Sequence, residues 1–390
     1  MAHFHRQFEP ENAFTVMPLT EVVRNFTPNW FAATMGTGAL ALVLNQFPLP
    51  VIGLHTVAVA VWLVNIGLFV TFALLYAARW IFHFDEARRI FDHPVMSMFF
   101  GTIPMGLATI VNGFVVFGPA LIGEQAIAVA HALWWLDAGL SLLCGIAIPY
   151  FMITRQEHSL DKLTAVWLLP IVASEVAAAS AGLLAPHLAA SEGLLVLVLG
   201  YVLWACSVPL AMSVLVLLFL RLALHKLPAR DMGVSAWLAL GPIGTGALGL
   251  LVLGSDAPAI FAANGRATIG EVALGLGVIG GLMLWGYGVW WLALAVLKTL
   301  RYLREGLPFN LGWWGFTFPL AVYTLATAAL YRATGLTLFA DLAGLMTICL
   351  TTFWIIVTAR TVHGACTRAL FVAPCLINAH GPVRFEADVV

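Results

Sequence analysis

Five predicted hydrophobic helices of this chain each contain a residue that breaks a helix. These residues are Gly36, Pro104, Pro170, Pro242 and Pro319. Successive breaks lie 66 to 77 residues apart, which is about two membrane spans with their loops. Lipid tolerates irregular backbone only where protein or a water-filled path surrounds it. The recurrence therefore predicts five helical hairpins arranged around one pathway.

The composition is that of a membrane protein. Hydrophobic residues make up 62% of the chain and charged residues only 9%, whereas soluble proteins have roughly a quarter charged residues. The first two dozen residues mix acidic and basic side chains, so we expect no cleavable signal peptide. The five cysteines form no CxxC pair, which favours packing roles over a disulfide framework or a metal site.

The positive charges predict the topology. Lys and Arg gather at both ends of the chain and at every second connection between apolar stretches, and only Arg266 and Arg332 fall on the other side. The positive-inside rule then places both termini in the cytoplasm, and an even number of spans is required. We expect ten spans, at 27–46, 54–78, 95–117, 128–153, 163–185, 194–222, 233–253, 268–297, 312–331 and 337–360.

The predicted fold class is an all-α polytopic membrane protein with ten transmembrane helices in five hairpins. Each break lies in the first helix of its hairpin, which favours an inner ring of broken odd-numbered helices around a central pore. We expect a cytoplasmic segment over 1–26, one transporter domain over 27–362 and a cytoplasmic tail over 363–390. The alternative is a solid bundle in which the prolines only kink their helices.

Three segments occur in an order that resembles a known family. They are FTPNWFAATMGTG at 26–38, DHP at 92–94 with GTIPMG at 101–106, and WWGFTFPL at 313–320. Together they resemble the tellurite-resistance/dicarboxylate transporter family, which is related to malic acid transport proteins, sulfite efflux pumps and the plant slow anion channel. The resemblance implies a multi-pass protein of the cell (inner) membrane that assembles as a homotrimer with one pore per subunit. It also implies that an aromatic residue of the ninth span closes the pore, and the matching residue here is Phe318.

Phe318 directly precedes Pro319, and a bulky ring at a break in a pore helix is suited to act as a hydrophobic gate. The alternative is ordinary helix packing. The residues in the same position before the other four breaks would form one largely apolar layer with Phe318. They are Met35, Ile103, Leu169 and Gly241.

The odd-numbered spans carry no Lys or Arg inside the membrane, so an anion would meet no deep fixed positive charge. The half-helix beyond each break instead offers the positive end of its dipole. Hydroxyl groups near the breaks are candidates to line the substrate path, unless they bond to their own helix backbone. These are Thr37, Thr102, Ser174, Thr245 and Thr317.

Two carboxylic acids fall inside predicted spans, where they usually have a partner or a function. Glu175 lies on a predicted pore helix five residues after Pro170, and it is the candidate for coupling protons to transport. The alternative is a hydrogen-bonded structural acid. Asp137 lies on a predicted outer helix, where we favour the structural interpretation.

These observations favour transport of small anions, with C4-dicarboxylates such as malate first, through a pore gated by Phe318. Sulfite or other oxyanion efflux and passive anion conduction are the alternatives. The spans contain no HExxH, no GxSxG and no paired acids at i, i+4, so we do not expect an enzyme. We expect no cofactor and no nucleic-acid partner; the partners are the anionic substrate and the lipid bilayer.

Overall fold

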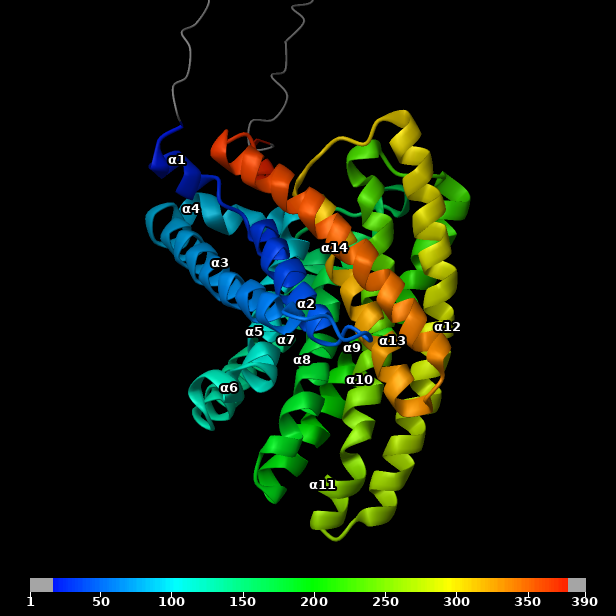
Figure 1. The fold of residues 1–390 in the computed structure, drawn as a ribbon. Helices are drawn as coiled ribbons and strands as arrows, with labels where there is room; N and C mark the ends of the chain where they lie inside the picture. Colours follow the sequence, from blue (N-terminus) through cyan, green and yellow to red (C-terminus); the bar gives the residue numbers. More distant parts are fainter. Residues whose placement is uncertain (1–16, 378–390) are drawn as a thin grey trace, which may run out of the picture.

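The computed structural model describes residues 17–377, and these contain helices and connecting turns but no β-strand (Figure 1). The all-α prediction is therefore confirmed for this part of the chain. Residues 1–16 of the predicted N-terminal segment and 378–390 of the predicted tail lie outside the described residues. The predicted bounds of the cytoplasmic segment, the transporter domain and the cytoplasmic tail stay predictions.

Eight helical segments of the described chain are long and apolar enough to cross a membrane. They are Leu54–Phe82, Met96–Val116, Gln125–Thr154, Ala165–His187, Ala190–His225, Arg230–Ser255, Ala267–Glu305 and Thr337–Cys366. The predicted first and ninth spans are not among these eight, and their helices α2 (Ala32–Asn45) and α13 (Phe318–Thr334) have 14 and 17 residues. Ten spans thus remain a prediction, although ten helices build the bundle.

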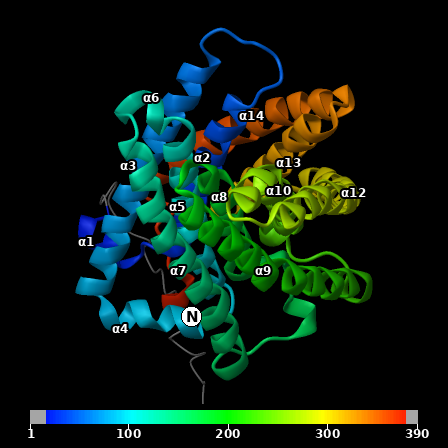
Figure 2. The ribbon, with the colours of Figure 1, turned by 90° about the horizontal axis from the view of Figure 1, so that it is seen from below.

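Five helices form a closed inner ring, in which each contacts the next. In ring order they are α2, α5 (Thr102–Val116), α8 (Leu169–Leu184), α10 (Leu240–Ser255) and α13, which returns to α2. Figure 2 shows these five in the middle of the molecule. Nearly all of their residues are buried, as expected for helices that are apolar on every side.

Five longer helices surround this ring, and each packs on the inner helix that precedes it in the chain. They are α3 (Leu54–Phe82), α7 (Gln125–Thr154), α9 (Ala190–His225), α12 (Ala267–Glu305) and α14 (Thr337–Cys366). Large apolar side chains such as Leu74, Ile146 and Leu297 are exposed on their outer faces. So much exposed apolar surface is stable only against lipid or another protein.

Short helices complete the described chain. They are α1 (Leu19–Arg24), α4 (Phe84–Ala87), α6 (Gly118–Ile122), α11 (Ala257–Ala263) and α15 (Pro374–Ile377), with 3₁₀ turns η2 (Arg88–Asp92), η4 (Leu160–Lys162) and η6 (Ala185–His187). The other 3₁₀ segments each lead into an inner helix. These are η1 (Pro28–Phe31), η3 (Met96–Gly101), η5 (Ala165–Leu168), η7 (Arg230–Ala239) and η8 (Leu311–Phe316).

Four of the predicted breaks mark the change from 3₁₀ to α-helix. Pro104, Pro170, Pro242 and Pro319 each occupy the second or third position of an inner α-helix. The first N–H groups of an α-helix have no acceptor within it, so proline costs no hydrogen bond there and its fixed φ suits the helix. These prolines therefore start α-helices instead of kinking their middles.

The predicted break at Gly36 is wrong. Helix α2 runs through Gly36 without interruption, and the change from 3₁₀ to α-helix comes earlier, between Phe31 and Ala32. The glycine serves close packing instead. A Cβ at this position would overlap the Thr317 hydroxyl and would lie 2.8 Å from Cε3 of Trp314.

Close approach at a glycine recurs at every interface of the inner ring. Beside Gly36 between α2 and α13, the positions are Gly106 against Thr34, Gly101 against Leu169, Gly182 against Leu253 and Gly244 against Tyr323. A small residue lets two helix backbones approach, which is the main source of packing energy between helices in lipid. The ring is therefore held at five glycine contacts.

We predict that Gly36→Ala destabilises the protein by about 1–3 kcal/mol, the usual effect of overpacking a tight contact. The matched control is Gly67→Ala, since a Cβ on Gly67 of α3 would meet nothing within 4 Å. Thermal unfolding in detergent should show a lower midpoint for Gly36→Ala alone. Equal midpoints for the two variants would show that the α2–α13 contact is not tight.

Candidate functional site

A cavity of about 370 Å³ lies at the end of the inner ring where the five inner helices begin. The five 3₁₀ segments that lead into the inner helices all contribute to its wall, together with the first turns of α2, α5, α8 and α13. Its lining is mostly apolar, with Met96, Phe99, Val166, Leu238 and Leu311 among the wall residues. The junctions between 3₁₀ and α-helix thus form the mouth of the ring.

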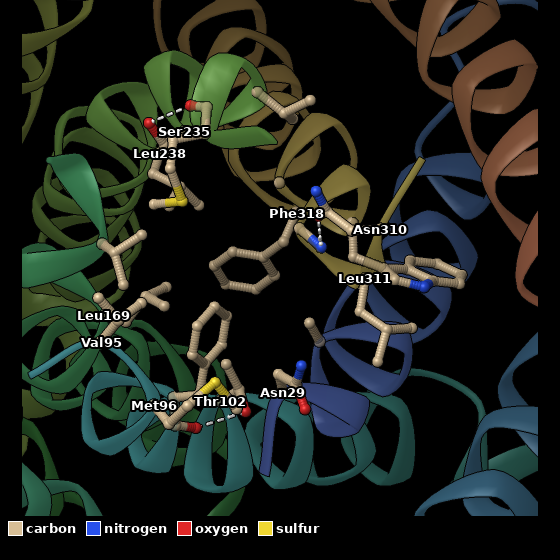
Figure 3. Close-up of a pocket in the computed structure, with 18 of the residues that line it drawn as sticks. Asn29, Val95, Met96, Thr102, Leu169, Ser235, Leu238, Asn310, Leu311 and Phe318 are labelled. Atoms are coloured by element: carbon tan, nitrogen blue, oxygen red, sulfur yellow. Dashed lines mark hydrogen bonds between the residues drawn. The ribbon is translucent and has the colours of Figure 1, made fainter. Parts of the chain in front are cut away.

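The ring of Phe318 reaches into the middle of this space, as Figure 3 shows. Phe318 is the first residue of α13 and is only 3% exposed. Met35 and Leu169, from α2 and α8, also line the cavity. Three of the five residues of the predicted layer therefore line one cavity.

The other two members of the predicted layer lie outside the cavity lining. Ile103 is half-buried and packs against the apolar core. Gly241 lies on α10, where an added Cβ would reach only Cγ of Pro319, at 4.0 Å. The layer is consequently incomplete on the sides of α5 and α10.

Two of the predicted path hydroxyls donate to backbone carbonyl groups of the protein itself. Thr102 lines the cavity, but its Oγ1 lies 2.7 Å from the carbonyl oxygen of Phe99 and 2.8 Å from that of Pro28. Thr317 donates to the carbonyl oxygen of Trp314 at 2.8 Å. These bonds leave the two hydroxyls less available to a passing anion.

The remaining three hydroxyls are buried away from the cavity lining. Thr37 accepts a hydrogen bond from Nε1 of Trp354 at 3.0 Å, which ties α2 to α14. Ser174 is buried on α8. Thr245 on α10 is fully buried, and its Oγ1 has no hydrogen-bond partner within the part of the chain that the structure describes.

The cavity contains no positively charged side chain among the described residues. Its polar groups are Asn29, Thr102, Ser235 and Asn310, and Asp231 is its charged residue. The five inner helices all begin around the cavity, so the positive ends of their dipoles face it. The positive charges that an anion would meet in this cavity are therefore only partial, and the wall also carries the carboxylate of Asp231. In residues 17–377, no three His, Cys, Asp or Glu side chains gather as a metal site.

The two predicted acids are both fully buried, and neither lines the cavity. Glu175 lies on α8, and neither of its carboxylate oxygens has a hydrogen-bond partner among residues 17–377. The nearby hydroxyl of Ser207 donates instead to the carbonyl oxygen of Ile171 at 2.8 Å. Asp137 on α7 is equally unpartnered within the described chain.

Sequence reasoning missed much of the cavity wall. Asn310 caps η8 by accepting a hydrogen bond from the Gly312 N–H at 2.7 Å, and an Asn two residues before a Gly was a usable local signal. Pro374 also lines the cavity, although it lies beyond the last span. No local pattern could place Pro374 there, because it reaches the cavity only through the fold of the chain end.

Comparisons with known proteins identify the family of the chain. A family described as voltage-dependent anion channel matches residues 25–362. A sulfite efflux pump of Arthroderma benhamiae is 39% identical over 352 residues, which cover 90% of this chain and 93% of the pump. A malic acid transport protein of Schizosaccharomyces pombe is 25% identical over 317 residues, with 78% and 70% covered.

An uncharacterized transporter of Methanocaldococcus jannaschii is 29% identical over 354 residues, which cover 90% of this chain and 96% of that protein. The family and these relatives are channels and transporters, not enzymes. The family match spans most of the sequence, so the resemblance predicted from three short segments is confirmed. The chain belongs to the voltage-dependent anion channel family, whose members are multi-pass membrane proteins that move anions.

Proposed function

We propose that this protein exports sulfite or a closely related oxyanion through the inner ring, with Phe318 as the gate. The observation that carries the proposal is 39% identity, over 90% of the chain, to three fungal proteins named as sulfite efflux pumps. The malic acid transport protein shares only 25%. Sulfite therefore replaces malate as the first candidate, and C4-dicarboxylate transport becomes the alternative.

The cavity wall suits the passage of an anion better than its firm binding. Proteins that hold carboxylates firmly use Arg or Lys, and the described wall of this cavity has neither. Weak attraction by helix dipoles favours passage over retention. The apolar ring of Phe318 would keep the path dry until it moves.

We further propose that α2 and α13, each extended by its 3₁₀ segment, cross the membrane with the other eight. This gives ten spans and, by the positive-inside rule, cytoplasmic termini. The cavity then opens toward the cytoplasm, which suits export. A homotrimer in the cell membrane and a role in tellurite resistance rest on the family resemblance alone.

Purified protein in liposomes loaded with sulfite should release it faster than protein-free liposomes, which report the leak of neutral sulfur dioxide. We expect malate release to stay near its rate from protein-free liposomes loaded with malate. The measurement is the initial rate of each anion at equal concentration. Malate release as fast as sulfite release would contradict the preference for sulfite.

In the Phe318→Ala variant, sulfite flux should rise about tenfold, equivalent to lowering the barrier by ~1.4 kcal/mol. The matched control is Phe316→Ala, because Phe316 is also buried but packs on Trp237 and Phe353 and does not line the cavity. Initial sulfite fluxes of the two variants are compared with that of wild type. A similar rise in both would show loosened packing instead of a removed gate.

We also propose that Glu175 couples sulfite flux to protons, because it is a buried acid on an inner helix and its carboxylate has no hydrogen-bond partner within residues 17–377. Glu175→Gln should then keep sulfite flux but lose its dependence on a proton gradient. Asp137→Asn, which alters an equally buried acid on an outer helix, should keep that dependence. Gradient-independent flux in wild type would instead favour a passive anion channel.

A further inference from the structure

The chain turns back after α14 and runs along the side of the cavity mouth that η1 and η3 form; we call residues 367–377 the C-terminal strap. The turn follows from local structure. The Leu370 N–H donates to the carbonyl oxygen of Gly364 at 3.3 Å, and Arg368 adopts a φ of 60°. A Cβ on Gly364 would lie 2.6 Å from Leu370, so the glycine makes room for the return.

The strap is anchored on η1, the 3₁₀ segment that leads into α2. Phe371 stacks on Trp30 of η1, with ring centroids 4.8 Å apart and planes at 20°. Trp30 lies next to Asn29, which lines the cavity. The aromatic pair therefore fixes the strap beside the cavity mouth.

The strap also packs on the connection that leads into α5. Ala373 and Cys375 are 1% and 7% exposed and share an apolar cluster with Ile90 and Met96. Between them, Pro374 lines the cavity, as Met96 does. The strap is thus part of the wall of the cavity mouth.

Beneath the strap lies Arg79 of α3, whose side chain is fully buried. Its Nη1 donates to the carbonyl oxygen of Phe26 at 2.8 Å, and its Nη2 lies 3.5 Å from Sγ of Cys375. Its Nε has no partner, and no carboxylate of residues 17–377 forms a salt bridge with it. Arg79 is a buried cation without a counter-ion in the described chain.

A buried charge without a counter-ion is costly, and a thiol sulfur is a weak acceptor. Lifting the strap would return the guanidinium to water or to an anion, which offsets part of the packing lost on opening. The cost of burying the Arg79 guanidinium therefore opposes the packing that keeps the strap closed. Opening would also place a full positive charge beside a mouth whose described wall has no Lys or Arg.

We propose that the C-terminal strap is a lid that covers Arg79 as a masked anion-binding position, so that its release admits anions to the cavity. This inference goes beyond the proposed function, because it does not depend on which oxyanion is carried. It predicts two separable effects of release: exposure of Cys375 and greater anion flux.

The first test measures alkylation of Cys375 by a charged maleimide in a protein whose other cysteines are alanine (Cys144→Ala, Cys206→Ala, Cys349→Ala and Cys366→Ala). We expect Phe371→Ala to raise the alkylation rate about two- to tenfold, the effect of losing one aromatic pair. The matched control is Phe219→Ala, which removes a ring 5.6 Å from Trp290 between α9 and α12. An equal rate in Phe371→Ala and Phe219→Ala would overturn the closed strap.

The second test measures chloride and sulfite flux in the Phe318→Ala background, where the gate no longer limits the rate. Maleimide on Cys375 should hold the strap open and raise flux at least twofold over unlabelled protein. The gain should persist in Arg79→Lys and disappear in Arg79→Gln, provided that both elute as wild type in gel filtration. Unchanged flux after complete labelling would overturn the lid, and an equal gain in both Arg79 variants would overturn the anion-binding role.

The two tests separate this inference from the proposed function. If neither chloride nor sulfite moves in any variant, the transport proposal fails. The alkylation rates do not depend on transport, so they still decide whether the strap is closed over Arg79.

Discussion

The architecture depends on how closely five helix backbones approach one another. Glycines such as Gly36, Gly182 and Gly244 lie where a neighbouring helix would otherwise meet a Cβ. In lipid there is little hydrophobic gain from burying one helix against another, so close packing must hold the ring together. The outer helices can then present apolar side chains to lipid, while the inner helices remain almost wholly buried inside the protein.

The mouth of the ring follows from proline placement. A proline in the first turn fixes the start of an α-helix, and the preceding residues adopt a tighter 3₁₀ path. Prolines do this on α5, α8, α10 and α13, and on α2 the same change comes between Phe31 and Ala32 without a proline in the first turn. All five changes lie at the same end of the ring, so the 3₁₀ segments enclose one cavity. Phe318 begins its α-helix at that level, which is why its ring points into the space instead of into a helix interface.

Periodicity and charge were enough to predict the helices and their approximate bounds, because each signal is local. Phe318 could be selected as the candidate gate because it precedes a proline within a segment that resembles the family. Gly36 was misread because a glycine that breaks a helix and one that permits close packing look alike in sequence. Glu175 was correctly expected to be buried, but its facing depended on helix rotation after Pro170, which no local pattern fixes.

Contacts between residues far apart in the sequence could not be predicted from the sequence. Arg79 looked like one more positive charge at the end of a span, and only the fold shows that residues near both ends of the chain, Phe26 and Cys375, bury it. Similarly, Pro374 reaches the cavity across nearly the whole sequence. Such placements depend on tertiary packing, which also decides which residues a permeating anion would meet.

The central claim is that anions pass through the inner ring at the level of Phe318. It is tested most directly by a cysteine at Leu169, which lines the cavity, in a Phe318→Ala protein without other cysteines. A negatively charged thiol reagent should block anion flux through Leu169→Cys and leave Ile279→Cys, on the exposed face of α12, unaffected. Full labelling of Leu169→Cys with no loss of flux would place the pathway elsewhere.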